Sequence, residues 1–471
     1  MKKLLVVALI LLIFIVVYGI ALLAFVDPDI SMTLDRGYLQ TDRLRFGKDF
    51  LWGAATSAHQ VEGNCTNCNW SEFETAVDSL GHPRIARGQR SGLAADHWNR
   101  YKEDIQLLKE MHLNAYRFSV EWSKIEPDEG VFVDSVLDHY ERVVDELHAN
   151  GIEPFITLHH FTNPLWFEHS GGFERDDSPT IFARFAVKVV QRLGSKVRFW
   201  ATINEPNVYA VEGYYFGTFP PGQHDQFKTI HVFRNLLRAH TACYQAIKQI
   251  RPEAQVGLIN SIFLFDPPQR WNLLDVMLAH YLNKAFNISV IEYLNSGVFD
   301  VSLPGVASVH FETGVTEAFD FFGLNYYSRL QYHLQPFSRD KMVPVQSLPS
   351  EELTDKGWEI YKEGLYRAIH MVTSRTAKPV YITENGIADD SDQKRAGFIE
   401  DHILTANRAI FDGMNVKGYF FWSLTDNFEW TDGFDKHFGL YAVDYATQKR
   451  TLRQGSLKYK EIIMTWARRL Q

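Results

Sequence analysis

Two acidic residues, Glu205 and Glu384, end apolar runs that lie far apart in the sequence. Cleavage of a glycosidic bond needs such a pair, because one carboxylic acid protonates the departing oxygen while one carboxylate attacks or stabilises the electron-poor ring carbon. Their pKa values must differ, so that one group holds a proton and the other is charged. Arg117 and Tyr327 are the groups available to keep Glu384 ionised and oriented. The pair could therefore carry out acid–base and nucleophilic chemistry of this kind.

Other polar residues also stand within or at the ends of apolar runs, namely Arg117, His159-His160, Asn204 and Asn325–Tyr327. A buried large apolar side chain contributes about 1.5–3 kcal/mol to a core, whereas an unpaired buried charge costs several kcal/mol. Each of these positions taken alone is better explained by a structural ion pair or hydrogen bond. Their convergence at the ends of several runs favours a functional site.

These residues need a scaffold, and the rest of the chain supplies a regular alternation of short apolar runs and longer amphipathic stretches. Strand–helix alternation predicts a parallel sheet buried on both faces. Eight runs predict an α/β fold with a single closed (β/α)8 barrel, although counting alone does not exclude an open doubly wound sheet. The polar segment Leu330–Lys356 is expected to be a long loop on the catalytic face. The runs are Phe50–Ala55, Asn114–Val120, Glu153–His159, Arg198–Ile203, Gln255–Asn260, Asp320–Asn325, Pro379–Thr383 and Lys417–Ser423. The amphipathic stretches include Asp134–Ala149, Thr180–Leu193, Thr229–Ile250, Tyr361–Ser374, Gly397–Phe411 and Ser456–Leu470.

Composition restricts the class of protein further. The chain has 471 residues, 46% of them apolar and 22% charged, which is enough to build a large core. A net charge of −9 argues against a basic nucleic-acid surface. Three cysteines are too few for a four-thiolate zinc site or a disulfide framework.

The N-terminal segment has a composition of its own. Leu4–Val26 carries no formal charge, and as a helix it would be about 34 Å long, enough for a ~30 Å hydrocarbon core. We expect a transmembrane signal anchor over residues 1–26, a juxtamembrane linker over 27–46 and a catalytic domain over 47–471. Lys2 and Lys3 before the segment predict that everything after it lies on the extracytoplasmic side. Secretion after cleavage of a signal peptide is the alternative.

Two cysteines, Cys65 and Cys68, lie close together after the first run. In an oxidising compartment they could close a small loop, and they could equally stay reduced. A redox motif is less favoured because no thioredoxin-like strand and helix surround them.

Four motifs in a fixed order make the chain resemble the family 1 glycoside hydrolases, the β-glucosidase and β-galactosidase family of retaining enzymes. Thr202–Pro206 resembles the acid/base motif of that family, and Tyr381–Gly386 resembles its nucleophile motif. Phe50–Gly63 is similar to its N-terminal signature, and Phe421–Trp430 to its sugar-binding stretch. The resemblance covers about residues 47–465 and implies a retaining exo-β-glycosidase on a (β/α)8 barrel.

The resemblance also implies roles for single residues. Glu384 would be the nucleophile and Glu205 the acid that later acts as base, with their carboxyl groups ~5–5.5 Å apart and Arg117 and Tyr327 beside them. A terminal β-linked sugar would contact six further residues, and no metal or organic cofactor would be needed. His159 is expected to be structural, because adjacent strand residues point to opposite faces. The six sugar contacts are Gln60, His160, Asn204, Trp422, Glu429 and Trp430.

Two departures from the family pattern bear on the substrate. Asn64 and the Cys65–Cys68 loop follow the N-terminal signature, which leaves the preferred leaving group open. Glu429 stands where relatives acting on 6-phosphorylated sugars carry a serine, so an unphosphorylated sugar is favoured. A small β-glycoside or oligosaccharide is the expected substrate.

A binding module without catalysis and a transglycosidase are the competing interpretations. The sequence determines neither the preferred sugar nor the oligomeric state.

Overall fold

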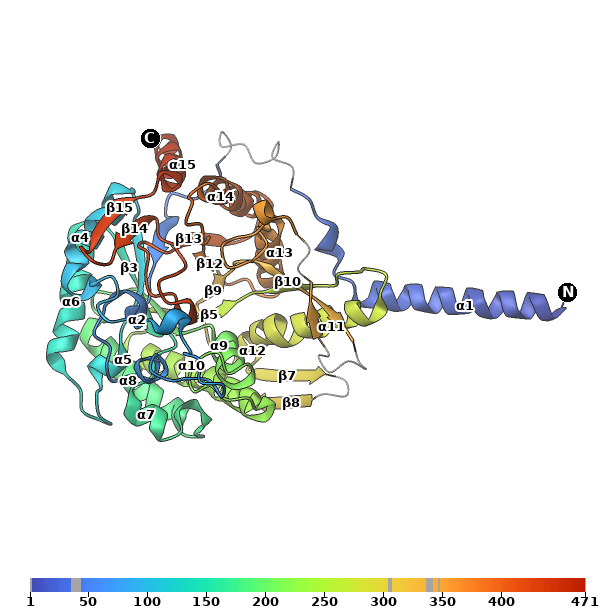
Figure 1. Cartoon of the computed structure of the whole chain (residues 1–471), viewed down its shortest axis with the longest axis horizontal. Coiled ribbons are helices and arrows are strands. Elements are labelled where there is room, and N and C mark those ends of the chain that lie inside the picture. Colours follow the sequence, from blue (N-terminus) through green and yellow to red (C-terminus); the bar gives the residue numbers. More distant parts are fainter. Residues whose placement is uncertain (1, 35–43, 304–306, 336–341, 346–347, 471) are drawn as a thin grey trace.

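The computed structural model describes residues 2–34, 44–303, 307–335, 342–345 and 348–470. Eight parallel strands form a closed barrel in the order β1-β13-β12-β9-β5-β4-β3-β2, and helices surround it (Figure 1). All eight predicted runs are barrel strands, so the prediction of a (β/α)8 barrel is confirmed. The strands are β1 (Leu51–Ala55), β2 (Ala115–Ser119), β3 (Glu153–His159), β4 (Phe199–Asn204), β5 (Gln255–Ser261), β9 (Phe321–Asn325), β12 (Val380–Asn385) and β13 (Val416–Trp422).

The barrel interior is filled by aromatic side chains below its C-terminal mouth. Phe155 of β3 stacks on Phe199 of β4, with ring centroids 5.4 Å apart, and also meets Phe420 of β13. Small residues on neighbouring strands make room for these rings: a Cβ atom at Gly53 would lie 2.3 Å from the ring of Phe420. The resulting apolar layer fills the lumen below the polar side chains at the strand ends.

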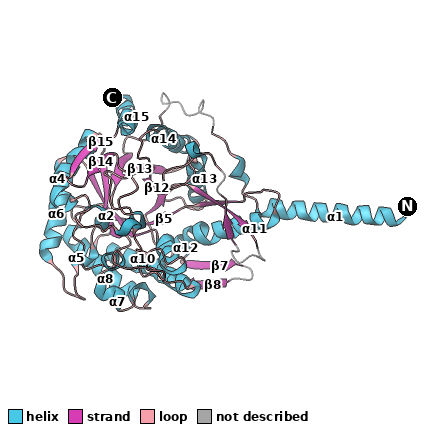
Figure 2. Cartoon of the chain, in the orientation of Figure 1, coloured by secondary structure: helices cyan, strands magenta, loops and turns pink. Residues whose placement is uncertain are grey.

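The helices follow the predicted amphipathic stretches closely. In α6, for example, the buried Leu137, Tyr140, Val143, Val144 and Leu147 recur at the three- and four-residue spacing of one helix face. Figure 2 shows the helices around the strands. The helices are α1 (Lys2–Phe25), α2 (Ala58–Val61), α3 (Asn69–Phe73), α4 (His97–Glu110), α5 (Trp122–Ile125), α6 (Asp134–Ala149), α7 (Leu165–His169), α8 (Ser178–Leu193), α9 (Pro206–Ala210), α10 (Gln226–Ile250), α11 (Leu273–Asn283), α12 (Ser289–Ser296), α13 (Lys362–Thr373), α14 (Arg395–Phe411) and α15 (Leu457–Leu470).

The predicted loop Leu330–Lys356 is only partly irregular. Its first residues belong to β10, which pairs with β6 in parallel and with β11 in the antiparallel direction. Residues 336–341 and 346–347 of this segment lie outside the described residues. The strands outside the barrel are β6 (Leu264–Asp266), β7 (Val298–Leu303), β8 (Ala307–Glu312), β10 (Arg329–Leu334), β11 (Met342–Pro344), β14 (Tyr441–Asp444) and β15 (Lys449–Leu452).

The N-terminal helix α1 forms over the predicted apolar segment, but the role predicted for it is corrected. Within the described parts of the chain, no helix is both long and apolar enough to cross a membrane. The predicted transmembrane helix, membrane partner and membrane-anchored location are therefore wrong. Packing accounts for part of the apolar surface instead. The Tyr18 hydroxyl donates to the Trp271 carbonyl at 2.6 Å, and the ring of Phe25 lies 5.1 Å from that of His280 in α11.

Only the ends of the predicted linker, residues 27–46, can be compared with the structure. Pro28–Ser31 forms a short 3-10 helix that Asp27 caps by accepting a hydrogen bond from the Asp29 amide. Asp27 also forms an ion pair with Arg367 of α13 at 2.6 Å, so this part of the chain is held against the barrel helices. Residues 35–43 lie outside the described residues.

Candidate active site

The two acidic residues are brought to the mouth of the barrel at the ends of β4 and β12. Glu205 directly follows β4 and is the N-cap of α9, with φ +47°, a left-handed conformation that L-residues other than asparagine and aspartate seldom adopt. Pro206 then begins the helix, where its missing amide hydrogen costs nothing. Strained backbone of this kind is concentrated at functional sites.

Glu384 is held by donors on both of its oxygen atoms. The fully buried Arg117 of β2 donates to Oε1 at 2.6 Å, and the Tyr327 hydroxyl donates to Oε2 at 2.7 Å. Arg117 is fixed in turn, because its other nitrogen atoms donate to Thr157 and Asn204. A carboxylate that accepts charge-assisted hydrogen bonds on both oxygens is stabilised as an anion with a fixed orientation.

Glu205 has a different environment, and none of the residues that the structure describes forms an ion pair with it. Its Oε1 accepts a hydrogen bond from the Asn325 amide at 2.8 Å. Burial, followed by the negative charge of Glu384, raises the pKa of Glu205 to about 8. At neutral pH this group therefore holds its proton. One carboxyl group accepts hydrogen bonds from Arg117 and Tyr327 and the other is kept protonated, which is the asymmetry that glycosidic cleavage requires.

A single hydrogen-bonded network joins the two acidic residues. Asn325 donates to both Glu205 and Asn204, and its own carbonyl oxygen accepts from Thr383, the residue before Glu384. Asn325 was not among the predicted site residues, although an amide side chain at the end of a buried strand was a usable signal. The separation of the two carboxyl groups stays a prediction.

The predicted sugar contacts form the adjoining wall of the mouth. His160 accepts a hydrogen bond from Asn204 at 3.1 Å, and its ring lies 5.9 Å from those of both Trp422 and Trp430. Burial, with the charge of Arg117 as a second cause, lowers the pKa of His160 well below its usual value, so the imidazole is neutral. All six predicted contacts are buried.

Gln60 and Glu429 are in direct contact with each other. The Gln60 amide donates to Glu429 Oε2 at 3.2 Å and to the Phe428 carbonyl oxygen at 2.9 Å. Lys356 lies 3.6 Å from Glu429 Oε1 and forms a closer ion pair with Asp432 at 2.7 Å. Lys356 was not among the predicted site residues, although its segment, Leu330–Lys356, was expected on the catalytic face. The structure thus brings all ten predicted site residues into one contact network.

His159 points to the other side of β3, as predicted for a structural residue. Its Nε2 is hydrogen-bonded to Asn163 at 2.9 Å, and its ring packs among Phe173, Phe182 and Tyr209. Burial lowers the pKa of His159 to about 4. The side chains of the two adjacent histidines therefore lie in different environments, and of the two only His160 lies at the mouth of the barrel.

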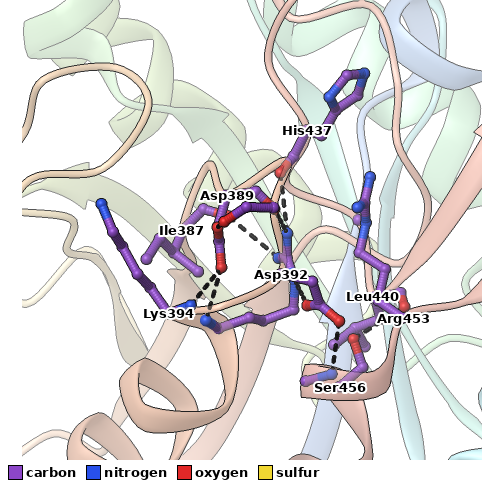
Figure 3. A network of polar contacts seen from close by, with 12 residues as sticks. Ile387, Asp389, Asp392, Lys394, His437, Leu440, Arg453 and Ser456 are labelled. Carbon is purple, nitrogen blue, oxygen red and sulfur yellow. Dashed lines mark hydrogen bonds and ion pairs between the residues drawn. The ribbon is translucent and has the colours of Figure 1, made fainter. Parts of the chain in front are cut away.

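A buried arginine holds the loop that follows the Glu384 strand. Arg395, at the start of α14, donates to the backbone carbonyl oxygens of Ile387, Asp389, His437 and Phe438 at 2.8–3.2 Å. Asp389 accepts hydrogen bonds from the amides of residues 394 and 395 and so caps the same helix (Figure 3). The network ties the segment after β12 to the segment before β14.

We expect Arg395→Met to lower the free energy of unfolding by about 3–5 kcal/mol, because it removes four hydrogen bonds to backbone carbonyl oxygens and the ion pair with Asp392. Urea unfolding followed by tryptophan fluorescence measures the change. Arg175→Met is the control, since Arg175 pairs with the exposed Asp177 and such surface pairs contribute about 1 kcal/mol or less. Equal losses in the two variants would contradict the role of Arg395 in holding the loop.

Comparison with known proteins agrees with this geometry. The sequence profile of glycosyl hydrolase family 1 matches residues 42–467. A 1,4-beta-D-glucan glucohydrolase from Thermotoga neapolitana is 33% identical over 89% of this chain and 98% of the relative. Among solved structures, a beta-glycosidase from Pyrococcus horikoshii is 36% identical with a TM-score of 0.80 over 90% of this chain and 95% of that protein. The beta-glucosidase from Thermotoga maritima in complex with glucoimidazole is 32% identical with a TM-score of 0.82, covering 89% of this chain and 99% of that protein.

The two carboxyl groups at the mouth of the barrel, together with the family match and the relatives, show that this chain is a glycoside hydrolase that acts on O-glycosyl bonds. The chain belongs to glycosyl hydrolase family 1. It is a retaining exo-β-glycosidase, as the sequence predicted.

Proposed function

We propose that Glu384 is the nucleophile and Glu205 the acid/base of this retaining glycosidase. The observation that carries the assignment is the asymmetry of the two groups. Arg117 and Tyr327 donate to both oxygens of Glu384, whereas Glu205 has an amide neighbour and a pKa raised to about 8 by burial and by Glu384. The catalytic unit is residues 47–471.

In the first step, Glu384 attacks the anomeric carbon while Glu205 gives its proton to the departing glycosidic oxygen. A covalent glycosyl-enzyme forms and the aglycone leaves. In the second step the deprotonated Glu205 takes a proton from water, which attacks the same carbon and releases Glu384. Arg117 keeps Glu384 oriented throughout, because its guanidinium is itself fixed by Thr157 and Asn204.

We propose that the substrate ends in an unphosphorylated β-linked sugar. It would be hydrogen-bonded to Gln60, His160, Asn204, Glu429 and Trp430, with Trp422 against its apolar face. A pyranose offers C–H faces to indole rings and hydroxyl groups to amides and carboxylates. Buried polar groups left unpaired would disfavour the wrong isomer. Glu429 disfavours a 6-phosphate, although Lys356 at 3.6 Å offsets part of its charge.

A panel of p-nitrophenyl β-glycosides tests this proposal. We expect hydrolysis of at least one of the glucoside, galactoside, fucoside and mannoside, with kcat/KM for the 6-phosphoglucoside about 100-fold or more below that for the glucoside, because like charges placed together cost several kcal/mol. Glu429→Gln is the matched variant and should lower the ratio of kcat/KM for the glucoside to kcat/KM for the 6-phosphoglucoside. A wild-type preference for the phosphorylated substrate would reject the proposed substrate class.

A further inference from the structure

Three potential metal ligands lie together outside the catalytic network, and two of them belong to the loop that departs from the family pattern. His59 is on α2, and Cys65 and Cys68 lie in the segment between α2 and α3. All three side chains are buried, with exposed fractions of 1%, 6% and 0%. The sequence pointed only to the cysteine pair, since nothing in it showed that His59 would fold back onto them.

The distances fit the coordination of a single ion. His59 Nδ1 lies 3.7 Å from Cys68 Sγ, and the ligand atoms of the three residues all lie within 4.8 Å of one another. In tetrahedral zinc coordination, with bonds of about 2.3 Å to sulfur and about 2.0–2.1 Å to nitrogen, neighbouring ligand atoms are about 3.5–3.8 Å apart. Small side-chain rotations would therefore bring all three atoms onto one ion.

The surroundings of His59 select the nitrogen atom that a metal needs. Its Nε2 lies 2.8 Å from Glu74 Oε1, and the other oxygen of Glu74 accepts a hydrogen bond from the Ser91 amide at 3.0 Å. A carboxylate that accepts the Nε2 hydrogen leaves the lone pair on Nδ1, which faces Cys68. Carboxylate–histidine pairs of this kind orient metal-ligating imidazoles in many zinc sites.

We propose that His59, Cys65 and Cys68 bind one thiophilic divalent cation, with Zn²⁺ as the best chemical match. Soft thiolates together with a neutral imidazole favour zinc over magnesium or calcium. On binding, both thiols lose their protons to solvent, and the two thiolates neutralise the charge of the ion, as a buried site requires. The fourth ligand is a water molecule or the Ser123 hydroxyl, which lies 3.5 Å from Cys65 Sγ.

A metal ion bound at this site would stabilise one wall of the sugar-binding region. The imidazole of His59 stacks on Trp430 with centroids 5.9 Å apart and an interplanar angle of 7°. Cys68 pairs with Pro164 through a β-bridge, and the next residue donates to the Asn163 carbonyl oxygen. A metal at this position would join the loops after β1 and β3 behind Trp430. The proposal stands on ligand geometry and does not depend on the catalytic roles of Glu205 and Glu384.

The test measures metal in the full-length chain, purified with a phosphine reductant and without chelators, after incubation with Zn²⁺ and removal of excess ion. We expect inductively coupled plasma mass spectrometry to find one equivalent of zinc per chain in the wild type. Cys243→Ser is the control and should bind the same amount, because Cys243 is buried elsewhere, on α10. Cys68→Ser and His59→Gln should lose most of it. Cobalt added to the metal-free wild type should give thiolate charge-transfer and tetrahedral ligand-field absorption bands. This measurement uses only the wild type, so it does not depend on the folding of a variant.

A disulfide between Cys65 and Cys68 is the competing state, and it would consume both sulfur ligands. A wild-type chain that stays metal-free after reduction and incubation with zinc would overturn the proposal. So would a metal content unchanged in Cys68→Ser, or a cobalt spectrum without thiolate bands. Hydrolysis of the p-nitrophenyl glycosides is recorded in parallel, so failure of the metal site is distinguished from failure of the substrate assignment.

Discussion

Glu384→Gly is expected to lower kcat for an aryl β-glycoside by about 10⁵-fold, the size of effect seen when a covalent nucleophile is removed. The loss is large because the first displacement has no attacking group, while Arg117 and Tyr327 are left facing an open space. That space is where a small anion can bind. With azide or fluoride supplied, the anion attacks the anomeric carbon from the vacated face, and the aryloxide leaves from the other.

The product identifies the nucleophile. A single displacement inverts the configuration, so the adduct should be the α-glycosyl azide or fluoride, observable by nuclear magnetic resonance of the anomeric proton. Glu384→Gln is the matched control, because its amide fills the same space and should give no rescue. A glycine variant that keeps most of its activity, or a β-configured azide, would show that another residue attacks the sugar.

The barrel could be predicted because its strands are buried on both faces. Such strands appear in the sequence as continuous apolar runs. The observed bounds agree with the predicted ones in β3 and differ from them by at most two residues in the other barrel strands. The small strands β10 and β11 were missed. In β10 every residue is half-buried, so neither a continuous nor an alternating pattern marks it.

The candidate site divides in the same way. Polar residues at strand ends were visible, because a buried strand has no other use for Arg117 or Glu384. Lys356 could not be identified from the sequence, since it reaches Glu429 from a loop whose path depends on the packing of β10.

The N-terminal segment shows a further limit of sequence reasoning. Apolarity predicted the helix correctly, but it did not predict that Tyr18 would contact Trp271 and that Phe25 would contact α11.

Glu205→Ala is expected to act selectively, according to the leaving group. A poor leaving group such as an alkyl alcohol or a second sugar needs a proton as the bond breaks, so kcat/KM should fall by about 10²–10⁴-fold for such substrates. A dinitrophenolate leaves unprotonated, so its first step should change far less. Stopped-flow release of dinitrophenol, compared with glucose release from an alkyl glucoside, measures the difference. Equal losses on both substrates would count against Glu205 as the acid.

The pH profile gives a second reading of the same residue. Burial and the charge of Glu384 raise the pKa of Glu205 to about 8, so the acid form is present below that pH and is lost as the pH rises through it. In the wild type, kcat/KM on an alkyl glucoside should therefore fall on the alkaline side near pH 8. Glu205→Gln keeps the side-chain shape and can still accept from Asn325, but it has no proton to release in this range. Its residual activity should show no alkaline fall, and a fall that persists would place the titrating group elsewhere.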